Sequence, residues 1–171
     1  MAVANTKATA TVSSLQTLNI TRALFTNGAN IGLLKADVAV AAADDDGSVY
    51  RLWQGLDPRL RPLIIMIGTT AITGGTSYGL GLYDTSDGAV INSTVFMSAQ
   101  TMASAVALSH LAGINGLSNL ANTAIGKMLY EHAGHSGDSI RTAYDICLTA
   151  ATVGSAAGTI SAAMLYALPS Q

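Results

Sequence analysis

The sequence predicts a mainly β protein, a jelly-roll-like antiparallel sandwich with one inserted helix. Short apolar or alternating segments recur along the 171 residues, turns rich in Gly and Asp separate them, and one long segment has helical spacing. About eight short strands joined by such turns are typical of a sandwich or jelly roll. We therefore expect a single β domain over residues 15–171.

An N-terminal arm precedes this domain in the prediction. Residues 1–14 are rich in Ala, Thr and Ser and contain no apolar run. Such a segment buries too little apolar area to order itself, so we expect an extended, flexible arm or one that lies across a partner.

Three strands are expected in the first part of the domain, and they are Thr17–Phe25, Asp37–Ala42 and Val49–Trp53. The pair Asp46-Gly47 predicts a hairpin between the last two, because Asp and Gly tolerate the positive φ of a tight turn. Gly55–Pro62 is a proline-bounded loop. Leu63–Ile67 follows it, and because this segment is apolar on both faces we expect it to be the central core strand.

The middle of the chain combines strands with weaker helical signals. Tyr78–Tyr83 alternates large and small residues and predicts a strand, and Ala89–Ile91 predicts a short one. Ser98–Leu108 fits a helix with Ser98 as its N-cap. Leu117–His132 repeats apolar residues at helical spacing, and Gly134 stands where a helix would end, so this is the predicted inserted helix.

Two strands close the chain in this prediction, Tyr144–Leu148 and Ile160–Leu168. The spacing of the second also fits a helix. We favour the strand because Gly, Thr and Ser lead into it.

Charge is scarce throughout, with 11% charged residues, a net charge of −2 and half of the chain hydrophobic. This balance gives no electrostatic footprint for nucleic acid or anionic lipid. The long uncharged stretches are interrupted by Gly, Thr and Ser, which argues against membrane spans, and residues 1–14 do not resemble a signal peptide. We expect a protein made in the cytoplasm, with its charges on outward loops at Asp44–Asp46 and Asp84–Asp87 and its uncharged stretches in the core and in subunit contacts.

One motif invites an enzymatic interpretation. Gly75-Thr76-Ser77-Tyr78-Gly79 matches the nucleophile elbow of serine hydrolases, in which a strand-to-helix turn exposes the serine. Asp138 with His132 or His135 could complete a triad. Here the motif leads into a predicted strand, and no βαβ alternation is present, so we expect no catalysis, and a serine hydrolase using Ser77 stays as the enzyme alternative.

Metal and cofactor sites are not expected. His132 and His135 lie where the predicted helix ends, without a second ligand cluster. Asp44-Asp45-Asp46-Gly47-Ser48 lacks the spacing and the distal Glu of a calcium loop. The single cysteine, Cys147, cannot form an internal disulfide, and we expect it to be buried without a redox role.

A candidate partner contact surrounds the proline-bounded loop. Arg51, Trp53, Arg59 and Arg61 cluster there in the sequence. Arg and Trp are common anchors of protein interfaces. The alternative is an ordinary solvated loop.

Four segments together resemble the head decoration (cement) proteins of tailed bacteriophages. They are Asp46–Trp53, Ile65–Tyr83, Lys127–Gly134 and Ala143–Leu168. In order they give a strand, a strand pair across a glycine loop, a helix and a closing strand pair. None of these motifs is catalytic, and their order and spacing carry the resemblance.

This resemblance implies a jelly-roll-like structural protein on the outside of a virion capsid. Its partners would be the major capsid protein and further copies of itself, as a homodimer or homotrimer, and it would bridge neighbouring capsid subunits. Another repeated virion component, a tail or spike protein, is the structural alternative. No cofactor, nucleic acid or membrane is implied.

Overall fold

The computed structural model describes residues 5–7, 23–24, 30–110, 126–136 and 143–168. Within these residues, ten strands form two five-stranded sheets. The strands are β1 (Asn5–Lys7), β2 (Ala23–Leu24), β3 (Asn30–Val40), β4 (Ser48–Leu56), β5 (Arg61–Thr69), β6 (Thr76–Asp84), β7 (Val90–Gln100), β8 (Val106–His110), β9 (Tyr144–Thr152) and β10 (Gly158–Leu168). The mainly β prediction is confirmed.

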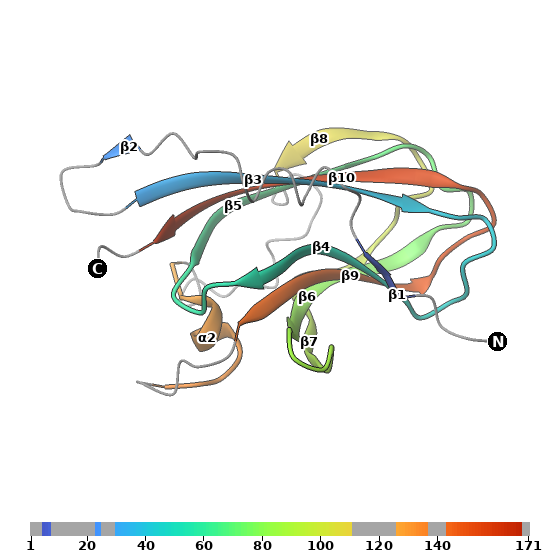
Figure 1. The fold of residues 1–171 in the computed structure, drawn as a ribbon. Coiled ribbons are helices and arrows are strands. Elements are labelled where there is room, and N and C mark those ends of the chain that lie inside the picture. Colours follow the sequence, from blue (N-terminus) through green and yellow to red (C-terminus); the bar gives the residue numbers. More distant parts are fainter. Residues whose placement is uncertain (1–4, 8–22, 25–29, 111–125, 137–142, 169–171) are drawn as a thin grey trace.

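The two sheets lie face to face (Figure 1). We call the sheet with the order β2-β3-β10-β5-β8 the upper sheet and the sheet with the order β1-β4-β9-β6-β7 the lower sheet. Without the short edge strands β1 and β2, the two sheets have the orders β3-β10-β5-β8 and β4-β9-β6-β7. This is the strand order of a jelly roll. Of the predicted arm 1–14, the structure describes β1, which pairs parallel to β4 at the edge of the lower sheet.

The core lies between the sheets and is built from alternate residues of each strand. In β3, Leu34, Ala36, Val38 and Val40 are buried while Leu33, Lys35 and Ala39 are exposed. The same period of two, which follows from the pleat of a strand, places Leu80, Leu82, Ile146 and Leu148 inside from the lower sheet. The larger buried side chains include Trp53, Tyr50, Tyr78 and Phe96.

The Asp46-Gly47 turn crosses between the sheets, so the hairpin expected there is wrong. β3 pairs with β2 and β10, whereas β4 pairs with β1 and β9. Gly47 does adopt a positive φ of 85°, and its N–H donates to the Ala150 carbonyl at 2.7 Å. The predicted turn is therefore present, but each of its two flanking strands pairs with strands elsewhere in the chain.

The aspartates of this turn hold it in place. The Asp44 carboxylate accepts hydrogen bonds from the Ala41 N–H at 2.9 Å and from the Tyr50 hydroxyl at 2.8 Å. Asp46 accepts from the Val153 N–H at 2.9 Å. Their role in the structure is therefore to fix the crossing from one sheet to the other.

The segment Ser98–Leu108 is not a helix. Its first residues end β7, where Gln100 pairs with Tyr78, and its last residues begin β8, where Val106 pairs with Thr69. Small residues are compatible with both helix and strand. Here the edges of β6 and β5 offer free hydrogen-bonding groups, and pairing with them makes the two ends of this segment strands. The strand expected at Ala89–Ile91 accordingly extends to Gln100.

The inserted helix is shorter than predicted where the structure describes it. It is α2 (Leu129–His132), and residues 117–125 of the prediction lie outside the described residues. Gly126 has a φ of 81° and Met128 is extended, which excludes helix at these positions. The Leu129 N–H donates to the Leu60 carbonyl at 3.0 Å, so α2 is held against the connection between β4 and β5.

The closing strands are confirmed, and β10 settles the alternative of a helix at Ile160–Leu168 in favour of the strand. β10 pairs with β3 over eleven residues and with β5 on its other side, and it is therefore the central strand of the upper sheet. Leu63–Ile67 is a strand as expected, within β5, but it is neither central nor buried on both faces.

Candidate interaction surface

Large exposed hydrophobic side chains gather on the upper sheet. Among the described residues they are Leu33 in β3, Leu63 and Ile64 in β5, Leu108 in β8 and, on the lower sheet, Val90 in β7. Their exposed fractions run from 36% for Ile64 to 59% for Val90. Single exposed hydrophobics are ordinary, whereas four on one sheet make its outer side a candidate interaction surface.

The strand register aligns these side chains in rows. Leu165 of β10 pairs with Leu33 of β3 on one side and with Ile64 of β5 on the other. Residues that are paired across strands point to the same face of a sheet, so the three form a continuous apolar row on the outside of the sandwich. Leu63 adjoins this row, at the irregularity in the pairing of β5 with β10.

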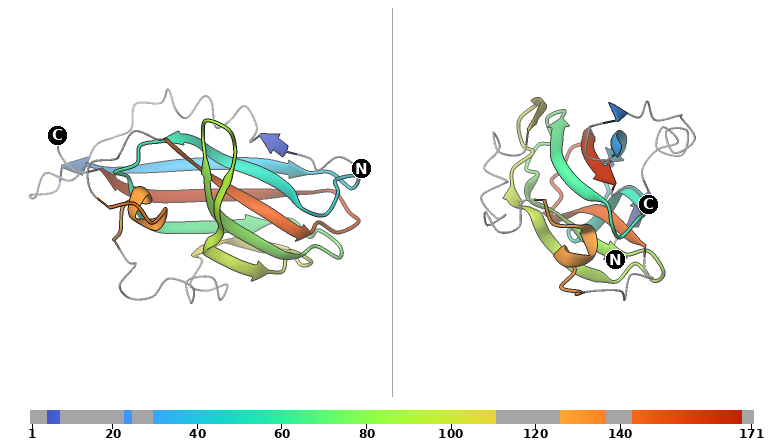
Figure 2. Two further views of the ribbon diagram at one scale, coloured as in Figure 1. Left: turned by 90° about the horizontal axis from the view of Figure 1, so that it is seen from below. Right: turned by 90° about the vertical axis from the view of Figure 1, so that its left-hand side faces the viewer.

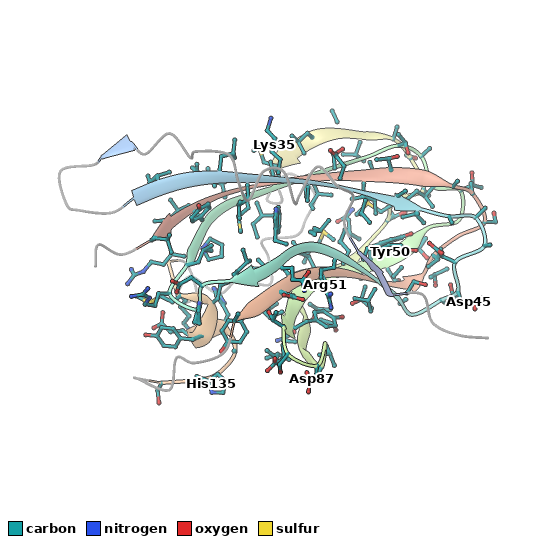
Figure 3. The ribbon with its side chains drawn as sticks, viewed as in Figure 1. Lys35, Asp45, Tyr50, Arg51, Asp87 and His135 are labelled. Carbon is teal, nitrogen blue, oxygen red and sulfur yellow. The ribbon has the colours of Figure 1, made fainter. Side chains whose placement is uncertain are left out.

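Two further rows follow along the strands. Lys35, Ala163 and Met66 form the next one, and Asp37, Ser161 and Gly68 the one after it. The Ser161 hydroxyl donates to the Asp37 carboxylate at 2.6 Å, while Lys35 projects from β3 away from the body of the protein (Figure 3). We call these three rows, together with Leu63 and Leu108, the upper face.

On the opposite side of the sandwich, the described chain covers part of the lower sheet itself. The connection between β6 and β7 folds back across the outside of the lower sheet (Figure 2). The backbone at Asn92 and Ser93 lies directly over Gly81, where a Cβ atom would collide with it. Gly79 faces the Ser93 carbonyl in the same way. Glycine at these two positions allows the close approach of one backbone to another.

A buried ion pair lies under this cover. The Arg51 Nε is 2.7 Å from the Asp145 Oδ2, and the Asp145 side chain has no exposed surface. The other Asp145 oxygen accepts hydrogen bonds from the Gly55 N–H at 2.8 Å and from the Thr85 hydroxyl at 2.7 Å. A buried carboxylate needs such partners, because removing it from water is costly.

Cys147 follows Asp145 by two positions on β9 and pairs with Arg51 of β4, so it lies on the same outer side of the lower sheet, and it is 1% exposed. Burial and then the negative charge of Asp145 raise the pKa of its thiol to about 12. The burial of this thiol, which the sequence predicts, is confirmed.

The four predicted contact residues do not come together. Arg51 is held in the ion pair and its side chain is 13% exposed. Trp53 is 1% exposed and lies in the core. The pairing of β4 with β9 is irregular between Arg51 and Trp53, and this irregularity breaks the alternation that would have placed the two side chains on one face of the sheet. Arg59 forms an exposed ion pair with Asp57 at 3.0 Å. Arg61 begins β5, opposite Ala167.

Arg61 is thus the predicted residue that borders the upper face. The apolar row itself was missed. The sequence feature that could have indicated this row is the uninterrupted apolar segment Leu63–Ile67, for which we predict a strand buried on both faces.

Ser77 has one property of an elbow nucleophile, a positive φ of 56°. It nevertheless begins β6, a strand of an antiparallel sheet, and no helix follows it. Ala99 on the adjacent strand β7 has a similar φ of 50°, so the backbone strain belongs to an irregular strand pair. Asp138 lies outside the described residues.

His132, the last residue of α2, packs against the core residue Phe96. The rings of His132 and Phe96 meet edge to face with their centroids 5.2 Å apart. Burial, followed by the charge of Lys127, lowers the pKa of His132. In the part of the chain that the structure describes, no three His, Cys, Asp or Glu side chains lie together as a metal site, and no helix is long and apolar enough to cross a membrane.

Comparison with known proteins gives structural neighbours only. No protein-family model and no curated protein matches the chain. A chain from the capsid of Ralstonia phage GP4 superposes with a TM-score of 0.55 at 14% identity, covering 92% of this chain and 95% of that one. A chain from the capsid asymmetric unit of cyanophage Pam1 gives 0.45 at 17% identity, covering 90% and 96%. What the GP4 chain shares with this protein is the fold. At this identity the likeness extends to the jelly roll and carries no residue-level role.

Proposed function

We propose that this protein is a structural component of a tailed-phage virion, which decorates the outside of the capsid and stabilises the shell by bridging neighbouring major capsid subunits. It would be made in the host cytoplasm and act in repeated copies. The observation that carries the proposal is the upper face, where Leu33, Leu63, Ile64 and Leu108 are exposed on one sheet of a jelly roll.

The likeness in fold to a chain of the GP4 capsid supports this proposal. The scarcity of charge supports it as well, because a face with few charges can pack closely against other subunits without a large desolvation cost. The positions that the structure describes at Ser77 and His132 are accounted for by strand geometry and core packing, so they do not favour the hydrolase alternative.

Of the four predicted contact residues, Arg59 and Arg61 are the ones that we retain for the shell. Arg59 lies in the turn between β4 and β5 and Arg61 at the start of β5. Their positive charges suit carboxylate groups on a capsid subunit. Arg51 and Trp53 serve the stability of the sandwich.

The test uses capsids from a phage that lacks this gene. The purified full chain should co-sediment with these capsids and raise the temperature at which they release their DNA. The variant Arg59→Ala/Arg61→Ala should bind more weakly, while Lys127→Ala, which removes a positive charge outside the upper face, serves as the matched control.

Two outcomes would contradict the proposal. Capsids that neither bind the protein nor gain heat resistance would rule out decoration. Binding to tails in place of capsids would support the alternative of a tail or spike component.

A further inference from the structure

We infer that Arg61 binds a carboxylate side chain of the partner protein, and that Arg59, two positions earlier in the chain, does not. The inference deepens the proposed function and rests on it for the partner, which there is a major capsid subunit. It follows from the contacts that the two guanidinium groups make within the protein.

Arg59 already holds a carboxylate. Its Nε and Nη2 atoms donate to the two carboxylate oxygens of Asp57 at 3.2 and 3.0 Å, and its backbone N–H donates to the same carboxylate at 2.8 Å. A guanidinium bound in this two-pronged way has a neutralised charge and one side of its fork filled. A second carboxylate would have to compete with Asp57, so Arg59 is a poor contact for an acidic partner.

Arg61 differs, since among the described residues no hydrogen bond or ion pair involves its guanidinium group. Its Nε atom is buried without a hydrogen-bond partner, while the residue as a whole is partly exposed. A charged N–H that loses water without gaining an acceptor is costly. An anion that binds the accessible part of this side chain would offset that cost, and it would order little that burial has not ordered already.

The carboxylates of this chain do not serve Arg61. Asp44–Asp46 follow β3, which ends beside the start of β10, whereas Arg61 pairs with Ala167 at the other end of β10. The other described carboxylates each accept a hydrogen bond or form an ion pair elsewhere, and they are Asp37, Asp57, Asp84, Asp87, Glu131 and Asp145. One carboxylate side chain, Asp138, lies outside the described residues and is therefore replaced in the test. We expect the acceptor for Arg61 to come from another molecule.

The backbone at Arg61 is fixed by the elements around it. The Leu129 N–H of α2 donates to the Leu60 carbonyl at 3.0 Å. The Tyr130 N–H donates to the Pro58 carbonyl at 3.1 Å. These two bonds hold the turn that leads into β5, and Arg61 is the first residue of that strand. A cation on a fixed backbone can select a carboxylate at one place on a partner surface.

A carboxylate suits this position better than a phosphate does. Surfaces that bind phosphate groups gather several cations. Here Asp57 neutralises Arg59, and Lys127 and Glu131 bring opposite charges to the α2 segment beside the same turn. One free guanidinium remains, and it matches the single charge of an Asp or Glu side chain.

The first experiment measures the binding of the full chain to capsids that lack this protein, by co-sedimentation. Arg61→Gln should weaken binding about tenfold or more, because it removes a hydrogen bond between charged groups, whereas Arg59→Gln should bind as the wild type does. On capsids whose carboxylates have been amidated with carbodiimide and ethanolamine, the wild type and Arg61→Gln should bind equally. An equal loss for Arg59→Gln, or an advantage of the wild type that survives amidation, would overturn the inference.

The second experiment tests the unpaired state of Arg61 without capsids. Arg61→Met in the free chain should keep the melting temperature within about 2 °C of the wild type or raise it, because no internal partner is lost. Arg51→Met, which breaks the buried ion pair, is the positive control. A larger fall for Arg61→Met would show an internal partner and overturn the inference, and the same fall for Asp138→Asn would identify that partner. Failure of the wild type to bind capsids would instead count against the proposed function.

Discussion

Arg51 and Asp145 form an ion pair of 2.7 Å between two neighbouring strands of the lower sheet, on its outer side. The pair is buried although it lies outside the sandwich core, because the connection between β6 and β7 covers it. Thr85 of that connection donates a hydrogen bond to Asp145, and Gly88 passes near the Arg51 guanidinium. The pair therefore links β4 and β9 to their cover.

Arg51→Met should lower the free energy of unfolding by about 3 kcal/mol, because it leaves the buried Asp145 carboxylate without its countercharge. Urea denaturation gives the value. Arg59→Met is the matched control, since it breaks the exposed pair with Asp57 and should change the free energy of unfolding much less than Arg51→Met. Equal losses in the two variants would show that the cover does not exclude water from Arg51.

Gly81→Ala should destabilise the protein by about 3 kcal/mol, because the added Cβ would collide with the backbone of Asn92 and Ser93 and push the cover away from the sheet. Gly55→Ala separates this steric effect from backbone strain. Gly55 has a φ of 67° with open space around it, so its substitution should cost about 1 kcal/mol. If Gly81→Ala were as stable as the wild type, the close approach of β7 to β6 would be wrong.

Stability should fall as the pH falls below about 6.5, in part through His132. Burial lowers the pKa of His132 in the folded protein, so below pH 6.5 the unfolded chain binds more protons at this residue than the folded one. Melting temperatures between pH about 8 and about 5.5 should show this slope, and His132→Gln should flatten it. An unchanged slope in the His132→Gln variant would show that this residue does not cause the loss of stability.

Cys147 should react very slowly with thiol reagents in the folded protein. A rise of its pKa to about 12 leaves about a thousandfold less thiolate at pH 8 than in an ordinary cysteine, and the side chain is also inaccessible. Labelling followed by mass spectrometry should show little modification until the protein is unfolded in guanidinium. Rapid labelling of the native chain would mean that the cover opens often.

The sequence predicted the strands that carry a clear alternation, such as Tyr78–Tyr83 and Ile160–Leu168, because each residue's side there depends only on the pleat of a strand. It also predicted turns at Asp44–Asp46 and Asp84–Asp87, and in the structure Asp84 ends β6 while Asp46 and Asp87 are exposed in the turns. Two mistakes share one cause. The hairpin predicted at Asp46-Gly47 and the helix predicted at Ser98–Leu108 are both wrong, because a local pattern does not reveal which distant strand offers free hydrogen-bonding groups.

The candidate surface shows the same limit at the level of single residues. Arg51 and Trp53 are two positions apart, which predicts a shared face, and an irregularity in the pairing of β4 with β9 sends Trp53 into the core. Leu33, Leu165 and Ile64 are far apart in the chain, and the register of β3, β10 and β5 alone makes them neighbours. The sequence by itself therefore determined the β class, the turn residues and the poverty of charge, all of which depend on local pattern and composition. Only the tertiary structure decided which exposed side chains lie together on the outer side of the upper sheet, because that depends on the pairing of β3 with β10, more than a hundred residues away in the chain.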